Sequence, residues 1–262
     1  MSDKKGFIQA LQDVYLQDPC KVLPNAIWKT ADKFPTLQHS IMHVNGEVVG
    51  MKAWDQQGLY VFWSKDRIID EPFQEICDTS QFVMIHDDHF RQIDANSYRL
   101  IKPFFSIRHD HQNISSYVLP NDFSIKEANP EEECTEISDF ISRCYRDLHP
   151  TPETVLSWTK HEVFDRNLWI WIIDQQKNIP AALGIAEFDP KVPEGALEWI
   201  QVLPEYQGRG LGKVLVLELL KRLEGRAAFT TVSGEVDNVT NPERLYRSCG
   251  FVGNDVWWLL QR

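Results

Sequence analysis

The stretch that decides the fold is WIQVLPEYQGRGLGKVLVLELL, residues 199–220. Its first residues alternate in polarity as a β-strand does, and its leucine-rich end has the spacing of an amphipathic helix. Between these two parts stand Gly208, Gly210 and Gly212. Glycine weakens helices and strands alike, so a cluster of three requires a reason. The pattern predicts a strand that ends near Leu203, a tight turn, and a helix that begins near Gly210.

A turn of this kind can bind an anion. The N-terminus of a helix has unpaired backbone N–H groups and a partial positive charge, and glycines let phosphate oxygens approach them. The alternative is a strand-to-helix turn in which glycine serves the backbone shape alone. The spacing Gly-x-Gly-x-Gly differs from the dinucleotide fingerprint Gly-x-Gly-x-x-Gly. A P-loop is also excluded, because it would need glycine at Gln207 and serine or threonine at Val214.

Two motifs resemble the signatures of the GNAT superfamily, the acyl-CoA-dependent N-acyltransferases. The stretch VLPEYQGRGLGKVL matches the pattern Gln/Arg-x-x-Gly-x-Gly/Ala at Gln207, Gly210 and Gly212. Downstream, NPERLYRSCGF is similar to the second signature, in which a helix with a tyrosine, here Tyr246, runs into Gly-Phe, here Gly250–Phe251. The two motifs stand in the order and at the separation that the family has.

The fold class expected from this resemblance is α/β (α+β). After a polar stretch at 112–122, the sequence predicts a strand, two helices, three strands, a helix, a strand, a helix and a strand. The resemblance therefore implies a GNAT acetyltransferase domain at 119–262, with a mixed central sheet flanked by helices. A smaller β-rich N-terminal domain is expected at 1–118, and it is a candidate for a degenerate GNAT-like half. In it, Asn45–Gly46 predicts a β-hairpin.

Some local signals are specific enough to be checked one by one. Pro103 interrupts the apolar stretch YRLIKPFFSIRHD, so we expect either an edge strand or a broken strand there. A helix is expected to run from the acidic stretch PEEE through Asp147. Thr151 and Pro152 predict the cap and the first residue of a further helix that extends to Asp165.

The resemblance implies a site for acetyl-CoA as a co-substrate. In this family the amides of the glycine turn hold the CoA pyrophosphate, and the edge of the preceding strand pairs with the pantetheine arm. The residues implied are the strand edge Gln201, Val202 and Leu203, the turn Gln207, Gly208, Arg209, Gly210, Leu211, Gly212 and Lys213, and an asparagine, Asn238 or Asn241. Asn241 has a second interpretation as the helix cap before Pro242.

The resemblance also implies transfer of the acetyl group to a primary amine by direct attack. This reaction needs a neutral amine, a donor for the tetrahedral oxyanion and a proton for the departing thiolate. The backbone N–H near Val202 is the implied oxyanion donor. Tyr246 is the implied proton donor, or else a tyrosine that closes the core over the ligand. Glu198, a carboxylate within a strand, is the candidate base, and its alternative is an exposed glutamate in a salt bridge.

The net charge of −11 argues against a nucleic acid as a partner, because phosphate binding needs a basic surface. An acidic protein is compatible with an amine-bearing small molecule or a protein amine as the acceptor. Neither a signal peptide nor a membrane span is expected. The five scattered cysteines predict reduced thiols in a cytoplasm.

No metal is expected. The histidines of HDDH (86–89) and RHDH (108–111) lack a specific zinc spacing, and we predict that they lie in polar surface turns. Trp199 is expected to line the acceptor groove. The first half is expected either to shape the acceptor site or to form a homodimer. A non-catalytic acyl-CoA-binding sensor is the alternative function.

Overall fold

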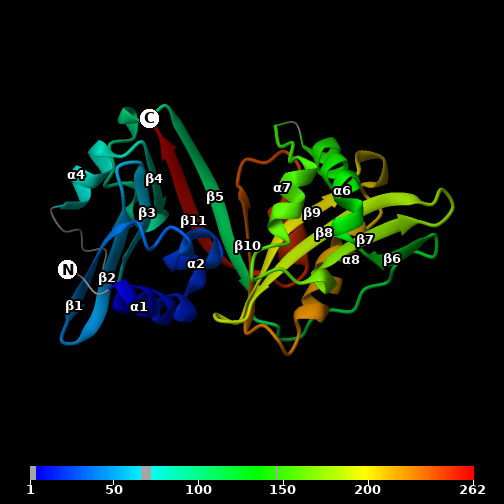
Figure 1. Ribbon diagram of the computed structural model, residues 1–262, viewed down its shortest axis with the longest axis horizontal. Helices are drawn as coiled ribbons and strands as arrows, with labels where there is room; N and C mark the ends of the chain where they lie inside the picture. The colour runs from blue at the N-terminus through cyan, green and yellow to red at the C-terminus, as the bar shows by residue number, and fades with distance from the viewer. Residues whose placement is uncertain (1–3, 66–71, 146) are drawn as a thin grey trace. The chain divides into compact units, whose positions relative to one another are not determined.

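The computed structural model describes residues 4–65, 72–145 and 147–262, which divide into two compact units (Figure 1). Unit 1 contains the described part of Met1–Arg108, together with Ser233–Glu243 and Val252–Arg262. Unit 2 contains His109–Val232 and Arg244–Phe251. The chain therefore enters each unit more than once.

Unit 1 starts with helices and continues with a three-stranded antiparallel meander. Its elements from the first half of the chain are α1 (Lys4–Gln17), α2 (Pro19–Val22), α3 (Trp28–Ala31), β1 (Gln38–Val44), β2 (Glu47–Trp54), β3 (Gly58–Ser64), α4 (Pro72–Thr79), β4 (Phe82–His86), α5 (Asp87–Phe90), η1 (Ala95–Ser97) and β5 (Leu100–His109). The hairpin predicted at Asn45–Gly46 is confirmed, with φ of 52° and 83° at its two central residues. Both values lie in the left-handed region that a type I′ turn requires.

The last strand of the chain, β11 (Val252–Gln261), belongs to unit 1, where it lies between β4 and β5 and is antiparallel to both. The fully buried Trp257 of this strand donates its Nε1–H to the carbonyl of Cys20 at 2.7 Å. Both predicted alternatives at Pro103, an edge strand and a broken strand, are wrong, because Pro103 pairs with Trp258 of β11 and β5 has a neighbouring strand on each side. Proline lacks only the N–H, and the Pro103 carbonyl still accepts a bond from the Val236 N–H at 3.0 Å.

Unit 2 contains the predicted elements in the predicted order, except that the last predicted strand, β11, belongs to unit 1. They are β6 (Phe123–Glu127), α6 (Pro130–Cys144), α7 (Pro152–Trp158), η2 (Arg166–Leu168), β7 (Trp169–Asp174), β8 (Ile179–Asp189), β9 (Glu194–Val202), η3 (Pro204–Tyr206), α8 (Leu211–Leu223), β10 (Phe229–Glu235) and α9 (Pro242–Ser248). The chain leaves unit 2 within β10, after Val232, and returns within α9, at Arg244. The strands β6 to β9 form an antiparallel meander, and β10 is parallel to β9.

The two predicted helices before β7 are shorter than expected. The first, α6, ends at Cys144, and Tyr145 already has extended backbone. The second begins as predicted, with the Thr151 hydroxyl accepting the Thr154 N–H at 3.2 Å. It ends at Trp158 because the sequence beyond it forms turns, and Asp165 caps the short helix η2.

Helices cover both faces of the unit 2 sheet (Figure 1). On one face Leu215 and Leu219 of α8 lie over Gly184, where an added Cβ would be 3.1 and 3.2 Å from them. On the other face Trp199 of β9 contacts Tyr145, at the end of α6, and Trp158 of α7. The sheet therefore lies between two layers of helices.

The order of elements occurs twice along the chain. Apart from the four-residue α3, the series from α1 to β5 and the series from α6 to β11 both read α-α-β-β-β-α-β-α-β. In both series the third strand of the meander also forms a short parallel pair with the next strand. The pair β3/β4 is recorded at Gly58–Leu59 and the pair β9/β10 at Glu194–Ala196.

The prediction that the four histidines lie in polar surface turns is wrong. In unit 1, His86 and His89 are buried. The Nε2 atom of His86 lies 3.1 Å from a carboxylate oxygen of Asp255, and the ring of His89 meets the ring of Phe62 edge-on at 4.9 Å. These contacts make both histidines part of the folded core.

In unit 2, His109 is also buried, and His111 is half-buried. The Nδ1 atom of His109 accepts the backbone N–H of His111 at 2.9 Å, and the Nε2 atom of His111 lies 2.7 Å from the Thr230 hydroxyl. Burial lowers the pKa of His111 to about 4, and the nearby His109 acts in the same direction. His111 is therefore neutral in the folded protein near neutral pH.

We predict that Leu219→Ala destabilises the protein. Leu219 is fully buried in α8, so the substitution leaves a cavity, and the free energy of unfolding should fall by about 2–5 kcal/mol. Urea unfolding measures this change. Glu224→Ala, at the exposed end of the same helix, is the control and should change stability by less than about 0.5 kcal/mol. Equal effects of the two substitutions would contradict the packing of α8.

We also predict that His111 makes stability depend on pH. In the unfolded chain a histidine binds its proton near pH 6.5, whereas folded His111 binds it near pH 4. Between these values the unfolded state holds more protons, so stability should fall as the pH decreases from about 6.5 to 4. His111→Gln should reduce this dependence in urea unfolding measured at several pH values. Identical slopes for the two proteins would refute the assignment.

Candidate functional site

Glycine is needed at the three positions of the turn for two different structural reasons. Gly208 and Gly210 have φ of 77° and 80°, in the left-handed region that favours glycine, and an added Cβ at either would have no heavy atom within 4 Å. Gly212 lies inside α8, where a Cβ would be 3.1 Å from Cδ2 of Leu245. Two glycines therefore shape an open turn, and the third allows α9 to pack closely.

The turn is fixed to the sheet by its neighbours. The Gln207 side chain donates to the carbonyl of Val202 at 3.2 Å. Tyr206 is buried, and its hydroxyl donates to Asp174 at 2.8 Å. The guanidinium of Arg209 lies over the Tyr206 ring, 5.3 Å from its centre. These contacts fix the helix N-terminus at the start of α8, within the predicted segment Gln207–Lys213. Its turn is exposed, and its first backbone N–H groups have no partner within the helix.

The strand before the turn has one free edge. Among the described residues, the β10 pairing partners of β9 end at Ala196, whereas β8 pairs with β9 up to Val202. Leu203 donates its N–H to the Ala181 carbonyl at 3.1 Å, toward β8. Because backbone direction alternates, Gln201 also points its N–H toward β8, and Val202 points its N–H to the free edge. Of the three predicted edge residues, only Val202 can offer an N–H there.

Glu198 occupies a β-bulge. In the β8/β9 register Trp199 pairs with Ile185 and Leu197 pairs with Ala186, so Glu198 is one extra residue on β9. A bulge bends its strand and re-aims a side chain, so simple alternation does not fix the direction of this carboxylate. Glu198 is half-buried.

Tyr246 lies close to Glu198. It is buried in α9, and its carbonyl accepts the N–H groups of Cys249 and Phe251 at the end of that helix. Burial raises the pKa of Tyr246, and the nearby Tyr145, Cys249 and Glu198 act in the same direction. The phenol therefore keeps its proton through neutral and moderately alkaline pH. Tyr246 and Glu198, the two residues predicted for catalysis, are within electrostatic range of each other.

Tyr145, which the sequence did not single out, completes this group. Its ring meets Trp199 edge-on at 5.8 Å, and Trp199 stacks on Trp158 at 5.5 Å with an interplanar angle of 23°. We call Tyr145, Trp158 and Trp199 the aromatic wall. The only local signal for Tyr145 is the end of α6, which turns this residue onto β9.

The two candidate asparagines belong to unit 1. The side-chain oxygen of Asn238 accepts the N–H and the hydroxyl of Thr240, at 2.9 and 2.7 Å, and so closes its own turn. Asn241 has φ of 46°, unlike the extended backbone of a usual helix cap. A contact of either asparagine with a cofactor stays a prediction.

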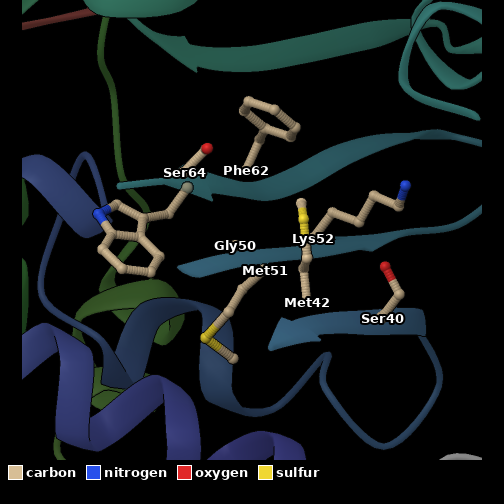
Figure 2. Close-up of a pocket in the computed structure, with 8 residues that line it drawn as sticks. Ser40, Met42, Gly50, Met51, Lys52, Phe62 and Ser64 are labelled. Atoms are coloured by element: carbon tan, nitrogen blue, oxygen red, sulfur yellow. The ribbon is translucent and has the colours of Figure 1, made fainter. Parts of the chain in front are cut away.

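In the described part of the chain, no group of three or more His, Cys, Asp or Glu residues could hold a metal ion, and no helix is long and apolar enough to cross a membrane. A small open hollow lies on unit 1 (Figure 2). Its lining residues are Ser40, Met42, Gly50, Met51, Lys52, Phe62, Trp63 and Ser64. None of them is a predicted site residue.

The comparisons with known proteins agree with this geometry. Residues 134–251 match the model of the acetyltransferase (GNAT) family. No curated protein sequence matches the chain. A GCN5-related N-acetyltransferase from Sphaerobacter thermophilus is 14% identical, with a TM-score of 0.66 over 90% of this chain and 84% of that one.

Two further solved structures are similar. A GNAT-family acetyltransferase from Colwellia psychrerythraea is 13% identical, with a TM-score of 0.61 over 87% of this chain and 86% of its own. A tandem GNAT protein from the clavulanic acid biosynthesis pathway is 14% identical, with a TM-score of 0.55 over 87% of this chain and 82% of its own. These similarities show the fold. The segment that matches the acetyltransferase (GNAT) family model, residues 134–251, contains the bulged strand, the glycine turn and Tyr246.

Proposed function

We propose that the protein is an N-acetyltransferase, which moves the acetyl group of acetyl-CoA to a primary amine by direct attack. The observation that carries this proposal is the pairing of an open glycine turn with a free strand edge. Gly208 and Gly210 leave the N-terminus of α8 accessible, and β9 loses its β10 partner beyond Ala196. A ligand with a diphosphate at one end and amide groups along its arm fits both features.

In this proposal the backbone N–H groups of Gln207–Lys213 bind the CoA pyrophosphate. The side chains of Arg209 and Lys213 are exposed beside them and add positive charge. The N–H of Val202 faces the free edge and would bind either the pantetheine arm or the thioester oxygen. The Val202 carbonyl already accepts the Gln207 side chain, which fixes the backbone at this point.

The chemistry follows from the neighbouring side chains. The neutral amine nitrogen would attack the thioester carbon while Glu198 takes the proton that this nitrogen loses as the C–N bond forms. The tetrahedral oxyanion would be stabilised by a backbone N–H of the β9 edge. As the C–N bond forms and the C–S bond breaks, Tyr246 would donate its proton to the CoA sulfur. Burial raises the pKa of Tyr246, so the phenol enters the reaction protonated, although the same shift makes it a weaker acid toward the thiolate.

For the first half we propose a degenerate GNAT-like domain at 1–118, followed by the acetyltransferase domain at 119–262. The repeated order of elements supports this proposal. Beside β3 the ring of Phe62 packs against Phe73 at 4.3 Å and His89 at 4.9 Å, so side chains occupy the space beside this strand. We further propose a cytoplasmic location, on the cysteine pattern of the sequence. The first half would either shape the acceptor site or form a homodimer.

Acetyl-CoA should stabilise the protein through the glycine turn. A ligand at a hundred times its dissociation constant adds about 2.7 kcal/mol to the free energy of unfolding, so the melting temperature should rise with acetyl-CoA or CoA and not with ATP or NAD. Gly210→Asp places a carboxylate at the pyrophosphate and should abolish the shift. Gly225→Asp is the matched control, because Gly225 also has a positive φ, of 73°, and open space. Loss of the shift in both variants, or in neither, would contradict the proposed pyrophosphate site at the glycine turn.

Glu198→Gln should lower kcat by about 10²–10⁴, because the carboxylate takes the amine proton. Tyr246→Phe should lower kcat with little change in KM for acetyl-CoA. Steady-state kinetics from pH 6 to 9, with release of the free thiol as the signal, measures both effects. Normal turnover and an unchanged pH profile in Glu198→Gln would rule out the base assignment. Acetyl-CoA binding without turnover of any amine would favour a sensor.

A further inference from the structure

Strand β5, from the first half of the chain, lies between the strands that precede and follow α9. The sheet order is β11-β5-β10, and α9 connects β10 to β11 along the chain (Figure 1). The segment Arg244–Phe251, which carries Tyr246, belongs to unit 2, whereas Ser233–Glu243 before it and Val252–Arg262 after it belong to unit 1. Unit 1 therefore holds both ends of the segment that carries the proposed proton donor.

The strand after this segment is bound on both of its sides. The antiparallel register of β11 with β5 runs from Asp255, opposite Ser106, to Gln261, opposite Leu100. On its other side β11 pairs with β4. The Asp255 carboxylate also lies 3.1 Å from the Nε2 atom of buried His86. These contacts fix the point at which the chain leaves α9.

The strand before the segment is held by β5 as well. Val236 donates its N–H to the Pro103 carbonyl at 3.0 Å. At Gly234 the backbone comes close to β5, because an added Cβ would lie 2.7 Å from Cζ of Phe105, whose side chain is buried. Carbon atoms in contact are about 3.5–4.0 Å apart, so a larger residue would push β10 away from β5. Glycine at this position thus sets the distance between the two strands.

The inserted strand determines how far apart the two ends of the segment are. Neighbouring strands lie about 4.8 Å apart, so β10 and β11, with β5 between them, are about 9.6 Å apart. We infer that β5 is a positioning strand, which sets this spacing and through it the place of Tyr246. The inference rests on the proposed role of Tyr246, because proton transfer requires a donor within about 3 Å of the accepting atom. It gives the first half a role besides the acceptor site and the homodimer.

Gly234→Ala tests whether this spacing matters. The added methyl group collides with Phe105, and relief of the collision should move β10 by about 1 Å. A misplacement of this size can lower a rate by about a hundredfold. We expect kcat to fall by about tenfold to a hundredfold, and KM for acetyl-CoA to stay within about twofold, because the proposed pyrophosphate site is unchanged.

A second change should reverse this loss. Phe105→Leu removes the ring carbon that the new methyl group strikes, so the double variant Gly234→Ala/Phe105→Leu should regain kcat to within about threefold of the wild type. Gly58→Ala is the matched control, because a Cβ there would lie 2.5 Å from the Phe82 ring, in strands that do not flank α9. We expect it to lower the melting temperature and to leave kcat within about twofold.

Two measurements separate positioning of Tyr246 from a general loss of structure. In a Tyr246→Phe background, Gly234→Ala should lower kcat by less than about threefold, whereas a merely structural loss would lower it by the same factor in both backgrounds. Incorporated 3-fluorotyrosine labels the seven tyrosines, and Tyr246→Phe identifies the resonance of Tyr246. This resonance should shift in Gly234→Ala, return in the double variant, and stay in place in Gly58→Ala.

The fluorine spectrum also separates this inference from the proposed function. If the wild type turns over and Gly234→Ala leaves both kcat and the Tyr246 resonance unchanged, the positioning inference fails alone. Equal losses of kcat in Gly234→Ala and Gly58→Ala overturn it as well. If acetyl-CoA does not bind, the proposed function fails, and a resonance that shifts in Gly234→Ala and returns in the double variant still supports β5 as the positioning strand. An unmoved resonance overturns it.

Discussion

The structure of unit 2 depends on the partial pairing of β9. This strand keeps its β8 partner up to Val202, but its β10 partner only up to Ala196. Unpaired backbone groups beyond that point need other partners, and the Gln207 side chain supplies one to the Val202 carbonyl at 3.2 Å. The same side chain anchors the glycine turn. The free edge and the helix N-terminus are therefore formed together by the backbone, before any ligand binds.

Features that depend on a few neighbouring residues could be predicted from the sequence. The left-handed backbone at Gly208 and Gly210 follows from glycine spacing, and the Asn45–Gly46 hairpin follows from turn chemistry. The bulge at Glu198 could not be predicted, because it exists only in the register with Ile185 and Ala186. The contact between Trp199 and Tyr145 was equally hidden, since it depends on how α6 ends.

The histidines show the same limit more plainly. A run such as HDDH is polar and predicts surface, but His86 is buried beside Asp255, 169 residues later in the chain. His111 contacts Thr230 across 119 residues. A buried polar side chain is tolerated where a distant partner satisfies it, and a single sequence gives no information on that pairing.

The two repeated series show how one order of elements can produce a core in one place and a candidate site in another. Beside the short parallel pair of unit 1, Phe62 packs with Phe73 and His89, and apolar burial stabilises the fold. Beside the corresponding pair of unit 2, Glu198 occupies a bulge, and β9 has no β10 partner beyond Ala196. A bulge and an unpaired strand edge give up ladder hydrogen bonds, so they weaken the domain that holds them. Such a cost persists where a ligand supplies the missing contacts, and the backbone order alone does not decide where that is.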